Sequence, residues 1–317
     1  MPRTITVQAP ARLHFGLLDL RGDLGRRFGG IGAPAPEIFA RVSVSPAPVV
    51  DATGDDAARA ATFARRFLSH YDIHGGARIV VERAIPPHSG LGSGTQLGLC
   101  IARALSELYE VGATTPELAK SIGRARRSAV GTWTFDGGGF VLEGGRRIDG
   151  RDDIGPLLAR MPFPGSWRCV VAVPVAKPGV SGDAEAEAFA NLPAPSVADV
   201  ERVSHLVLMA MLPALAEADL ATFGASLSEV QDINGRWFSR AQGGTFAPGP
   251  TTALISTMRG LGVPGVGQSS WGPAMYGIVD GDVRATGLAD ALRGVLGVGG
   301  VFCGAFPSRG ALVTENW

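Results

Sequence analysis

Residues 85–105 read IPPHSGLGSGTQLGLCIARAL, and this stretch decides the fold because a glycine-rich loop runs directly into a helix. Leu97, Ile101 and Leu105 recur at the spacing of one helix face, which predicts an amphipathic helix after the loop. The N–H groups in the first turn of a helix have no partner inside the helix and carry its positive dipole end. The stretch therefore predicts a phosphate-binding loop at a helix N-terminus.

The loop offers two kinds of anion ligand at alternating positions. Its glycines let a phosphate approach the backbone amides, and its hydroxyl side chains add donors. It lacks the lysine of a P-loop and the glycine spacing of a dinucleotide-binding turn, and the simpler alternative is a turn that only caps the helix. The candidate substrate-binding residues of the loop are His88, Ser89, Gly90, Gly92, Ser93, Gly94 and Thr95.

The composition is that of an ordinary soluble enzyme with room for two packed cores. The chain has 317 residues, of which 45% are hydrophobic and 18% charged, with a formal net charge of +0. A neutral chain has no overall field that attracts nucleic acid or an anionic membrane, so we expect neither as a partner. We also expect no leader and no membrane span, since no stretch reaches the ~20 apolar residues required. A cytoplasmic location follows from this.

Strands and helices are mixed without a regular repeat, which favours an α+β fold over a doubly wound sheet. Alternating apolar residues predict strands in TITVQA, RLHFGLL, IFARVSVS and ARIVVERA, with a glycine-rich loop over residues 20–37. Thr115 before Pro116 predicts the start of a short helix. A break rich in proline and glycine near residue 165 predicts two domains, residues 1–165 and 166–317.

The segment LLDLRGDLGRR, residues 17–27, carries charges of both signs after an apolar strand. Asp19 and Asp23 are carboxylates able to hold Mg²⁺ or ribose hydroxyls, and Arg26 is able to clamp a phosphate or carboxylate with two hydrogen bonds. We expect Asp19 and Arg26 to be catalytic, with Asp19 also the metal ligand. The alternative is a solvated surface loop.

Two further segments offer groups that could line a site. In GQSSWG, Gln268 and Ser269 are candidates for contact with a phosphate or an aromatic acid. Trp133, Phe135 and Trp271 are candidate walls for an aryl ring, with ordinary core packing as the alternative. In KPGVSGDAEAEAF, residues 181–187 supply hydroxyl and carboxylate groups for a second lining loop. The alternative for this segment is a plain helix start.

Three motifs resemble those of the GHMP kinase superfamily, in the same order and over most of the chain: APARLHFGLLDL, PPHSGLGSGTQLGLCIARAL and GVPGVGQSSWGPAMYGIVD. Within the superfamily, RFGGIGAPAPE, RSAVGTWTFDGGGFVLEGG and VGQSSWGPAMYG resemble the β-ribofuranosylaminobenzene 5′-phosphate synthase family. The resemblance implies a two-domain GHMP-kinase-like α+β fold, with an N-terminal α/β domain and a C-terminal ferredoxin-like domain.

The resemblance also implies a reaction. Enzymes of that family join phosphoribosyl pyrophosphate to 4-aminobenzoate in tetrahydromethanopterin biosynthesis, with release of pyrophosphate and CO₂, and we expect Mg²⁺ as the cofactor. These two small molecules are the expected partners, and a homodimer is left open. The residues do not decide between 4-aminobenzoate and 4-hydroxybenzoate.

One departure separates this chain from the kinases that it resembles. Those kinases carry a catalytic aspartate in a Ser/Cys-Gly-x-x-Asp segment, whereas RRSAVGTWTF has Gly131 and Thr132 at that point. Phosphoryl transfer without the acid would depend on positioning and metal alone, so we expect a retained phosphate cradle without kinase chemistry. The alternatives are an ATP-dependent small-molecule kinase and a non-catalytic phospholigand-binding protein.

Overall fold

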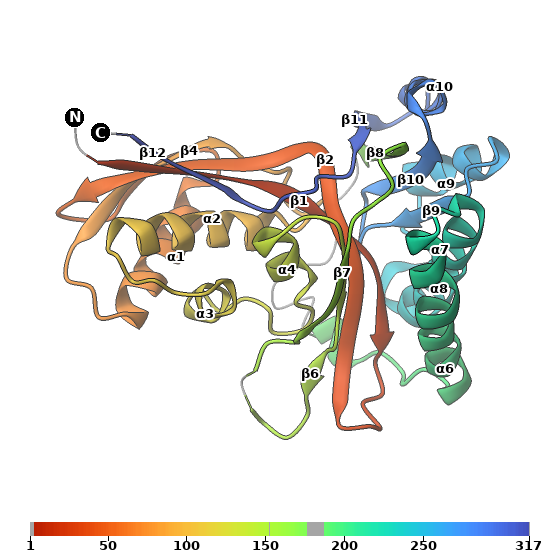
Figure 1. Cartoon of the computed structure of the whole chain (residues 1–317), viewed down its shortest axis with the longest axis horizontal. Helices are drawn as coiled ribbons and strands as arrows, with labels where there is room; N and C mark the ends of the chain where they lie inside the picture. The colour runs from red at the N-terminus through yellow and green to blue at the C-terminus, as the bar shows by residue number, and fades with distance from the viewer. Residues whose placement is uncertain (1–2, 152, 176–186, 317) are drawn as a thin grey trace.

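The protein folds into two β-sheets with helices packed against each (Figure 1). The computed structural model describes residues 3–151, 153–175 and 187–316. In this part of the chain, the first seven strands and the last strand form an eight-stranded sheet, and the remaining strands form a four-stranded sheet. The α+β prediction is confirmed, since helices and strands are mixed in both halves.

The large sheet is organised by a long antiparallel hairpin. Its strands are β1 (Thr4–Asp19) and β2 (Arg26–Ala47), and their pairing is irregular after Pro10 and after His14. β4 and β5 both pair with β2, because that strand is long enough to continue from one half of the sheet into the other. The other strands are β3 (Asp51–Gly54), β4 (Gly76–Arg83), β5 (Phe140–Glu143), β6 (Arg146–Arg147), β7 (Leu157–Met161) and β12 (Leu312–Asn316).

The helices of the first half lie against one face of this sheet (Figure 1). They are α1 (Ala57–His70), α2 (Ser93–Leu108), α3 (Thr115–Ser121) and α4 (Val130–Asp136). α3 begins one residue earlier than we expected from Thr115, because Thr114 forms a capping box with Glu117. Thr115 is instead buried in the first turn, where its hydroxyl donates to Asp136.

The small sheet is antiparallel and has the order β11, β8, β10, β9. Its strands are β8 (Trp167–Pro174), β9 (Gly265–Gln268), β10 (Met275–Asp280) and β11 (Val298–Ala305). The helices of this half are α6 (Val197–Leu206), a π-helical turn η1 (Val207–Met211), α7 (Leu212–Ala216), α8 (Leu220–Gln242), α9 (Pro250–Gly260) and α10 (Asp282–Arg293).

The two sheets share one hydrophobic core. The ring of Phe15 in β1 lies 4.9 Å from that of Tyr276 in β10, and a smaller cluster fills the space between the small sheet and α9 and α10. Polar contacts reinforce the junction, since Asn234 of α8 accepts a hydrogen bond from the Leu17 N–H at 2.6 Å and donates to the Leu17 carbonyl at 3.1 Å. α8 is therefore held against β1, beside the glycine loop.

Residues 26–36 are strand rather than the loop that their glycines led us to expect. A Cβ atom at Gly32 would lie 2.3 Å from the Leu13 carbonyl oxygen, so this glycine allows two strands to approach closely. The expected boundary near residue 165 falls between β7 and β8. β12 nevertheless returns to the large sheet, where it pairs with β1.

Candidate active site

The glycine loop makes a sharp approach to α2 that only glycine permits. Gly92 is the N-cap of the helix and has φ 74°, while Gly90 has φ 82°. A Cβ atom at Gly90 would lie 2.1 Å from the Ser269 carbonyl oxygen, and this backbone contact cannot be relieved by a side-chain movement. The loop therefore places the first turn of α2 beside the chain that leads out of β9.

The structure brings the three sequence motifs together around this loop. Arg12 of β1 donates through Nη1 to the Gly90 carbonyl at 2.5 Å. Ser269 donates through Oγ to the same carbonyl at 2.7 Å and accepts from the His14 N–H at 3.0 Å. The Ala274 N–H donates to the Ser89 carbonyl at 3.0 Å. Residues far apart in the sequence thus fix one loop from both sides.

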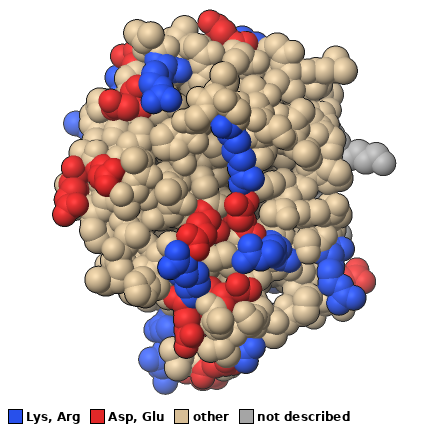
Figure 2. Space-filling model, turned by 90° about the vertical axis from the view of Figure 1, so that its right-hand side faces the viewer, with Lys and Arg blue, Asp and Glu red and all other residues tan. Residues whose placement is uncertain are grey.

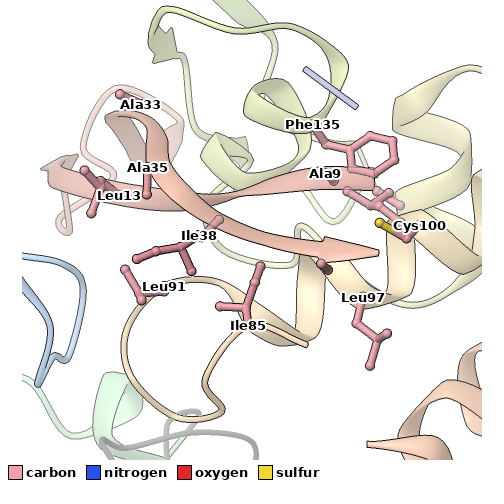
Figure 3. Close-up of a cluster of buried hydrophobic side chains, with 14 of the residues drawn as sticks. Ala9, Leu13, Ala33, Ala35, Ile38, Ile85, Leu91, Leu97, Cys100 and Phe135 are labelled. Atoms are coloured by element: carbon pink, nitrogen blue, oxygen red, sulfur yellow. The ribbon is translucent and has the colours of Figure 1, made fainter. Parts of the chain in front are cut away.

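Apolar contacts hold the base of the loop. Figure 3 shows Ile85 and Leu91 pointing into the same buried cluster as Leu13 and Ile38 of the long hairpin. Leu91 is completely buried and Ile85 nearly so. Since protein interiors are close-packed, the backbone amides above these side chains are held in one position before any ligand arrives.

A cavity of about 420 Å³ opens next to the loop. Thr95 and Gln268 lie in its wall, as do polar groups from β1, α8 and the link between α3 and α4. Its most unusual property is charge, because no Asp or Glu is among the described residues that line it. The lining includes five arginines, which are Arg12, Arg66, Arg124, Arg126 and Arg127.

Arginine side chains also crowd the first turn of α2. A Cβ atom at Gly94 would lie 2.8 Å from Nη2 of Arg124 and 3.2 Å from Nη1 of Arg59. The guanidinium groups therefore lie beside the helix turn whose N–H groups a phosphate would use. The outer face carried by α6 to α10 differs, because acidic and basic side chains lie side by side there (Figure 2), with ion pairs such as Arg202–Glu229 at 2.6 Å.

Aromatic rings line the other part of the cavity. Trp271 packs against Phe238 with ring centroids 4.8 Å apart and against Phe189 at 5.4 Å. The guanidinium of Arg127 lies over the Phe189 ring at 5.0 Å. The cavity therefore joins a cationic region to an apolar, aromatic one.

The structure gives the predicted loop residues different surroundings. Thr95 and Gln268 line the cavity. Gly92 and Gly94 contact the cavity arginines, since a Cβ at Gly92 would lie 2.8 Å from Cγ of Arg12. The other predicted residues lie outside the lining, with His88 exposed and with Ser89, Ser93 and Ser269 buried; Gly90 lies beneath Arg12 and Ser269.

Asp19 and Arg26 are not brought to this cavity. Asp19 accepts two hydrogen bonds through Oδ1 within the hairpin turn, from the N–H groups of Arg21 at 2.6 Å and Gly22 at 3.1 Å. Arg26 donates to the Gly145 carbonyl at 2.9 Å and borders a separate shallow pocket with Lys120 and Trp133. Their catalytic roles remain predictions that the contacts do not support.

The expected Mg²⁺ does not fit the cavity wall. Mg²⁺ is held in proteins mainly by carboxylates and water, and the described lining contains no carboxylate. Within residues 3–151, 153–175 and 187–316, no three His, Cys, Asp or Glu side chains cluster as metal ligands would. Of the predicted second lining loop, residues 181–186 lie outside the described part of the chain, and Glu187 is exposed.

The sequence position at which the kinases carry their aspartate is occupied by two buried residues of α4. Gly131 lies in the first turn of α4, where a Cβ atom would be 3.2 Å from the Thr95 side chain. Its carbonyl accepts a hydrogen bond from Gln96 at 2.9 Å. Thr132 is buried, with an exposed fraction of 1%. Neither residue lines the cavity, which agrees with the absence of a kinase aspartate at this point.

The arginines of the cavity were missed in the sequence. The segment GRARRS, residues 123–128, contributes three of them from the link between α3 and α4. Arg12 and Arg66 come from β1 and α1. The dense run of arginine in GRARRS was the available signal, but only the fold shows that it faces the glycine loop.

Comparisons with known proteins show the family of the chain. Residues 57–139 match the family model described as GHMP kinases N terminal domain. The chain is 33% identical to the beta-ribofuranosylphenol 5'-phosphate synthase of Methanothermobacter thermautotrophicus, over 98% of this chain and 99% of the relative. It is also 33% identical to the protein of that name from Archaeoglobus fulgidus, over 94% of this chain and 95% of the relative.

Solved structures share the fold at lower identity. Homoserine kinase from Cytophaga hutchinsonii superposes with a TM-score of 0.74 at 17% identity, over 98% of this chain and 97% of that one. Mevalonate diphosphate decarboxylase from Staphylococcus aureus gives a TM-score of 0.66 at 13% identity, over 99% of each chain. These likenesses confirm the two-domain α+β fold of the GHMP type. No helix in the described part of the chain is long and apolar enough to cross a membrane.

Proposed function

The chain belongs to the family of the beta-ribofuranosylphenol 5'-phosphate synthases, in the GHMP kinase superfamily, and from this premise we propose that it is a decarboxylating phosphoribosyltransferase. It joins phosphoribosyl pyrophosphate to 4-aminobenzoate and releases pyrophosphate and CO₂, as a step of tetrahydromethanopterin biosynthesis. The name of the relatives describes a phenol product, so 4-hydroxybenzoate is the alternative aryl substrate.

The observation that carries this proposal is a cavity lined by five arginines and no described carboxylate, beside a helix N-terminus. Phosphoribosyl pyrophosphate carries a phosphate and a diphosphate, and the aryl acid adds a carboxylate. Arginine recognises all three groups through paired hydrogen bonds. Because the described residues of the wall offer no carboxylate, we expect Mg²⁺ to arrive with the diphosphate.

The aromatic part of the cavity supports an aryl substrate. Three aromatic rings line the cavity together with the arginines, and they belong to Trp271, Phe238 and Phe189. An aryl ring packed there would lie near a ribose whose diphosphate rests on α2. Holding the two reactants in this way converts a bimolecular step into an effectively unimolecular one.

The proposed reaction depends on the charges that develop on the diphosphate and on C1 of the ribose. As the bond between C1 of the ribose and the diphosphate breaks, negative charge on the leaving group is stabilised by the amides of α2 and the guanidinium of Arg124. The ring carbon that bears the carboxylate then attacks the cationic C1, with electrons supplied by the para substituent. Loss of CO₂ restores the aromatic ring and leaves a carbon–carbon bond to the ribose. No group of the chain has to form a covalent intermediate.

The kinase alternative is disfavoured because Gly131 and Thr132 occupy the sequence position at which the kinases carry their catalytic acid. Neither residue lines the cavity. ATP turnover with an alcohol would support it, and ligand-dependent melting without any turnover would support the non-catalytic alternative.

The test is an incubation with phosphoribosyl pyrophosphate and carboxyl-labelled 4-aminobenzoate or 4-hydroxybenzoate. We expect labelled CO₂ and pyrophosphate in equal amounts, because the attacked carbon cannot regain aromaticity while it keeps its carboxylate. Pyrophosphate without CO₂ would contradict the carbon–carbon bond, and no product with either acid would contradict the proposed function.

A further inference from the structure

Glu143 is a buried carboxyl group for which the reaction above has no use. It ends β5 with an exposed fraction of 0%. Its Oε1 accepts from the Ala129 N–H at 3.1 Å, its Oε2 accepts from the Gly145 N–H at 2.8 Å, and the side chain of Ser128 also bonds to it. Burial raises the pKa of this carboxyl to about 7, although the three hydrogen bonds oppose the rise.

Ser128 connects this carboxyl group to the cavity. Its Oγ lies 3.0 Å from Nε2 of His14 and accepts from the Val130 N–H at 3.2 Å. A hydroxyl group has one donor and two acceptor positions, and Glu143, His14 and Val130 use all three. Ser128 and His14 both line the cavity, whereas Glu143 lies behind them.

His14 is fixed as a neutral imidazole. Its backbone N–H donates to Ser269, and its ring bonds to Ser128. Burial lowers the pKa of the His14 ring well below its usual value, and the positive charge of Arg12 adds to this effect. A neutral ring that accepts a proton at one nitrogen stays neutral only if it releases the proton of the opposite nitrogen.

We propose that Glu143, Ser128 and His14 form a proton relay, in which His14 takes a proton from the para O–H or N–H group of the aryl substrate while the ring attacks the ribose. The relay returns this proton when CO₂ leaves. The proposal rests on the proposed function, and it assigns His14 contact with the substrate and gives Ser128 and Glu143 positioning roles.

The hydrogen bonds define the direction of each transfer. When Glu143 is ionised, Ser128 donates to it, and His14 therefore donates from Nε2 to Ser128, which leaves Nδ1 as the acceptor. A proton that arrives at Nδ1 sends the Nε2 proton to Ser128 and the Ser128 proton to Glu143. Loss of CO₂ returns the electrons to the ring, and the three protons move back. The sequence balances without a net proton or an external acid.

The relay keeps positive charge out of a cavity that already holds several arginines. A positive charge on the His14 ring would be repelled by Arg12. A proton on Glu143 instead neutralises a carboxylate that lies outside the cavity lining. The charged groups on the elements around Glu143 have partners elsewhere. These are Arg26 with the Gly145 carbonyl, Arg27 with the Leu20 carbonyl, Arg146 with the Asp153 and Arg126 carbonyls, and Arg160 with Asp136. The cavity that His14 lines is also lined by Arg12, Arg124, Arg126 and Arg127.

Ser128→Ala tests the relay because it interrupts the path and leaves both backbone hydrogen bonds of Glu143 in place. In the parent protein we expect kcat to rise with pH through about pH 7, since Glu143 must be ionised to accept a proton. In the variant we expect kcat to fall roughly 100-fold, as for a lost acid–base group, with the rise near pH 7 removed and KM within about twofold of the parent.

Ser106→Ala is the matched control. Ser106 is also a buried serine that accepts a backbone hydrogen bond, from Ala113 at 3.3 Å, and it does not line the cavity. We expect the parent profile in this variant. A Ser128→Ala protein that keeps the parent kcat and its rise near pH 7 would overturn the proposal, as would a parent kcat that does not change between about pH 6 and pH 8.

A second measurement does not need turnover. The infrared carbonyl band of a protonated carboxylic acid reports Glu143 directly, and the hydrogen bond from Ser128 lowers its pKa. We therefore expect the midpoint of this band to move to higher pH in Ser128→Ala and to stay unchanged in Ser106→Ala. An unmoved midpoint in Ser128→Ala would contradict the Glu143–Ser128 link even if no riboside forms, so failure of the relay and failure of the proposed function are separable.

Discussion

Two arginine-rich turns of this chain look alike in the sequence and differ in the fold. The hairpin turn LRGDLGRR, residues 20–27, keeps its arginines on nearby groups. Arg21 pairs with Asp23 at 2.6 Å, Arg26 donates to the Gly145 carbonyl at 2.9 Å, and Arg27 donates to the Leu20 carbonyl at 2.8 Å. These arginines stabilise the turn that carries them.

The turn GRARRS, residues 123–128, lines the cavity opposite the glycine loop. It contains no acid of its own, and the described lining of the cavity supplies none. Several arginines gathered in one cavity wall raise the local positive potential, which favours an anionic ligand. The two turns differ in the place that the fold gives their arginines, which line a cavity in one case and bond within or beside the hairpin in the other.

The largest expected effect comes from the helix N-terminus that the cavity turn faces. Gly94→Val should weaken phosphoribosyl pyrophosphate binding more than ~100-fold, because its side chain occupies the space of Arg124 and Arg59. The fold should persist, since flexible ends of arginine can move. Calorimetric titration measures the loss, and Gly287→Val in α10, where a Cβ meets nothing within 4 Å, is the control. Parent-like binding by Gly94→Val would move the phosphate site elsewhere.

The direct comparison of the two turns is Arg124→Gln against Arg26→Gln. Loss of a charge-assisted hydrogen bond costs about 1.5–3 kcal/mol, so we expect KM for phosphoribosyl pyrophosphate to rise roughly 10- to 100-fold in Arg124→Gln. Arg26→Gln should change it less than about threefold, because Arg26 bonds to a backbone carbonyl outside the cavity. Equal losses in both variants would remove the distinction between the turns.

Asp19→Asn tests the role that the sequence suggested for the hairpin turn. A catalytic or metal-binding Asp19 would lose ~100-fold in kcat with its charge. We instead expect kcat within about twofold of the parent, since an asparagine Oδ1 still accepts from the N–H groups of Arg21 and Gly22. Steady-state kinetics over a range of Mg²⁺ concentrations decides between these outcomes, and a changed Mg²⁺ requirement would restore the sequence-based role.

The smallest expected effect concerns Asp23, at the exposed tip of the hairpin. Asp23→Asn removes the ion pair between Asp23 and Arg21, in which the Asp23 side chain is 56% exposed. Exposed pairs contribute about 0–1 kcal/mol, so we expect the free energy of unfolding in urea to change by less than about 0.5 kcal/mol and KM to stay constant. A clear rise in KM would mean that this turn also takes part in binding.

Local sequence signals were sufficient for the glycine loop and for the class of the fold. The spacing of Leu97, Ile101 and Leu105 predicted α2 and three of its buried residues, although the helix is buried on its other faces as well. The glycines before it marked the sharp approach at its N-terminus. The same reasoning failed for residues 26–36, because glycine also serves close strand contacts, as at Gly32. A run of glycines therefore does not by itself distinguish a turn, as before α2, from a close contact between strands, as at Gly32.

The cavity was less predictable because its wall comes from separate elements. Arg12 lies on β1, Arg66 on α1 and Arg124 on the link before α4, and nothing in the local sequence relates the three. Asp19 had the expected residue type at the expected strand end, but one of its carboxylate oxygens, Oδ1, accepts two hydrogen bonds within the turn. Contacts of this kind depend on tertiary structure, which propensity and spacing do not contain.

The return of β12 to the large sheet has a consequence for synthesis. β1 is translated before every other described strand, whereas its neighbour on one side, β12, is translated after all of them. Until then β1 exposes the backbone groups of an unpaired edge, which can attract other strands. The nascent chain therefore cannot complete its large sheet until β12 has been made, and chains that terminate before β12 should be the ones that chaperones retain.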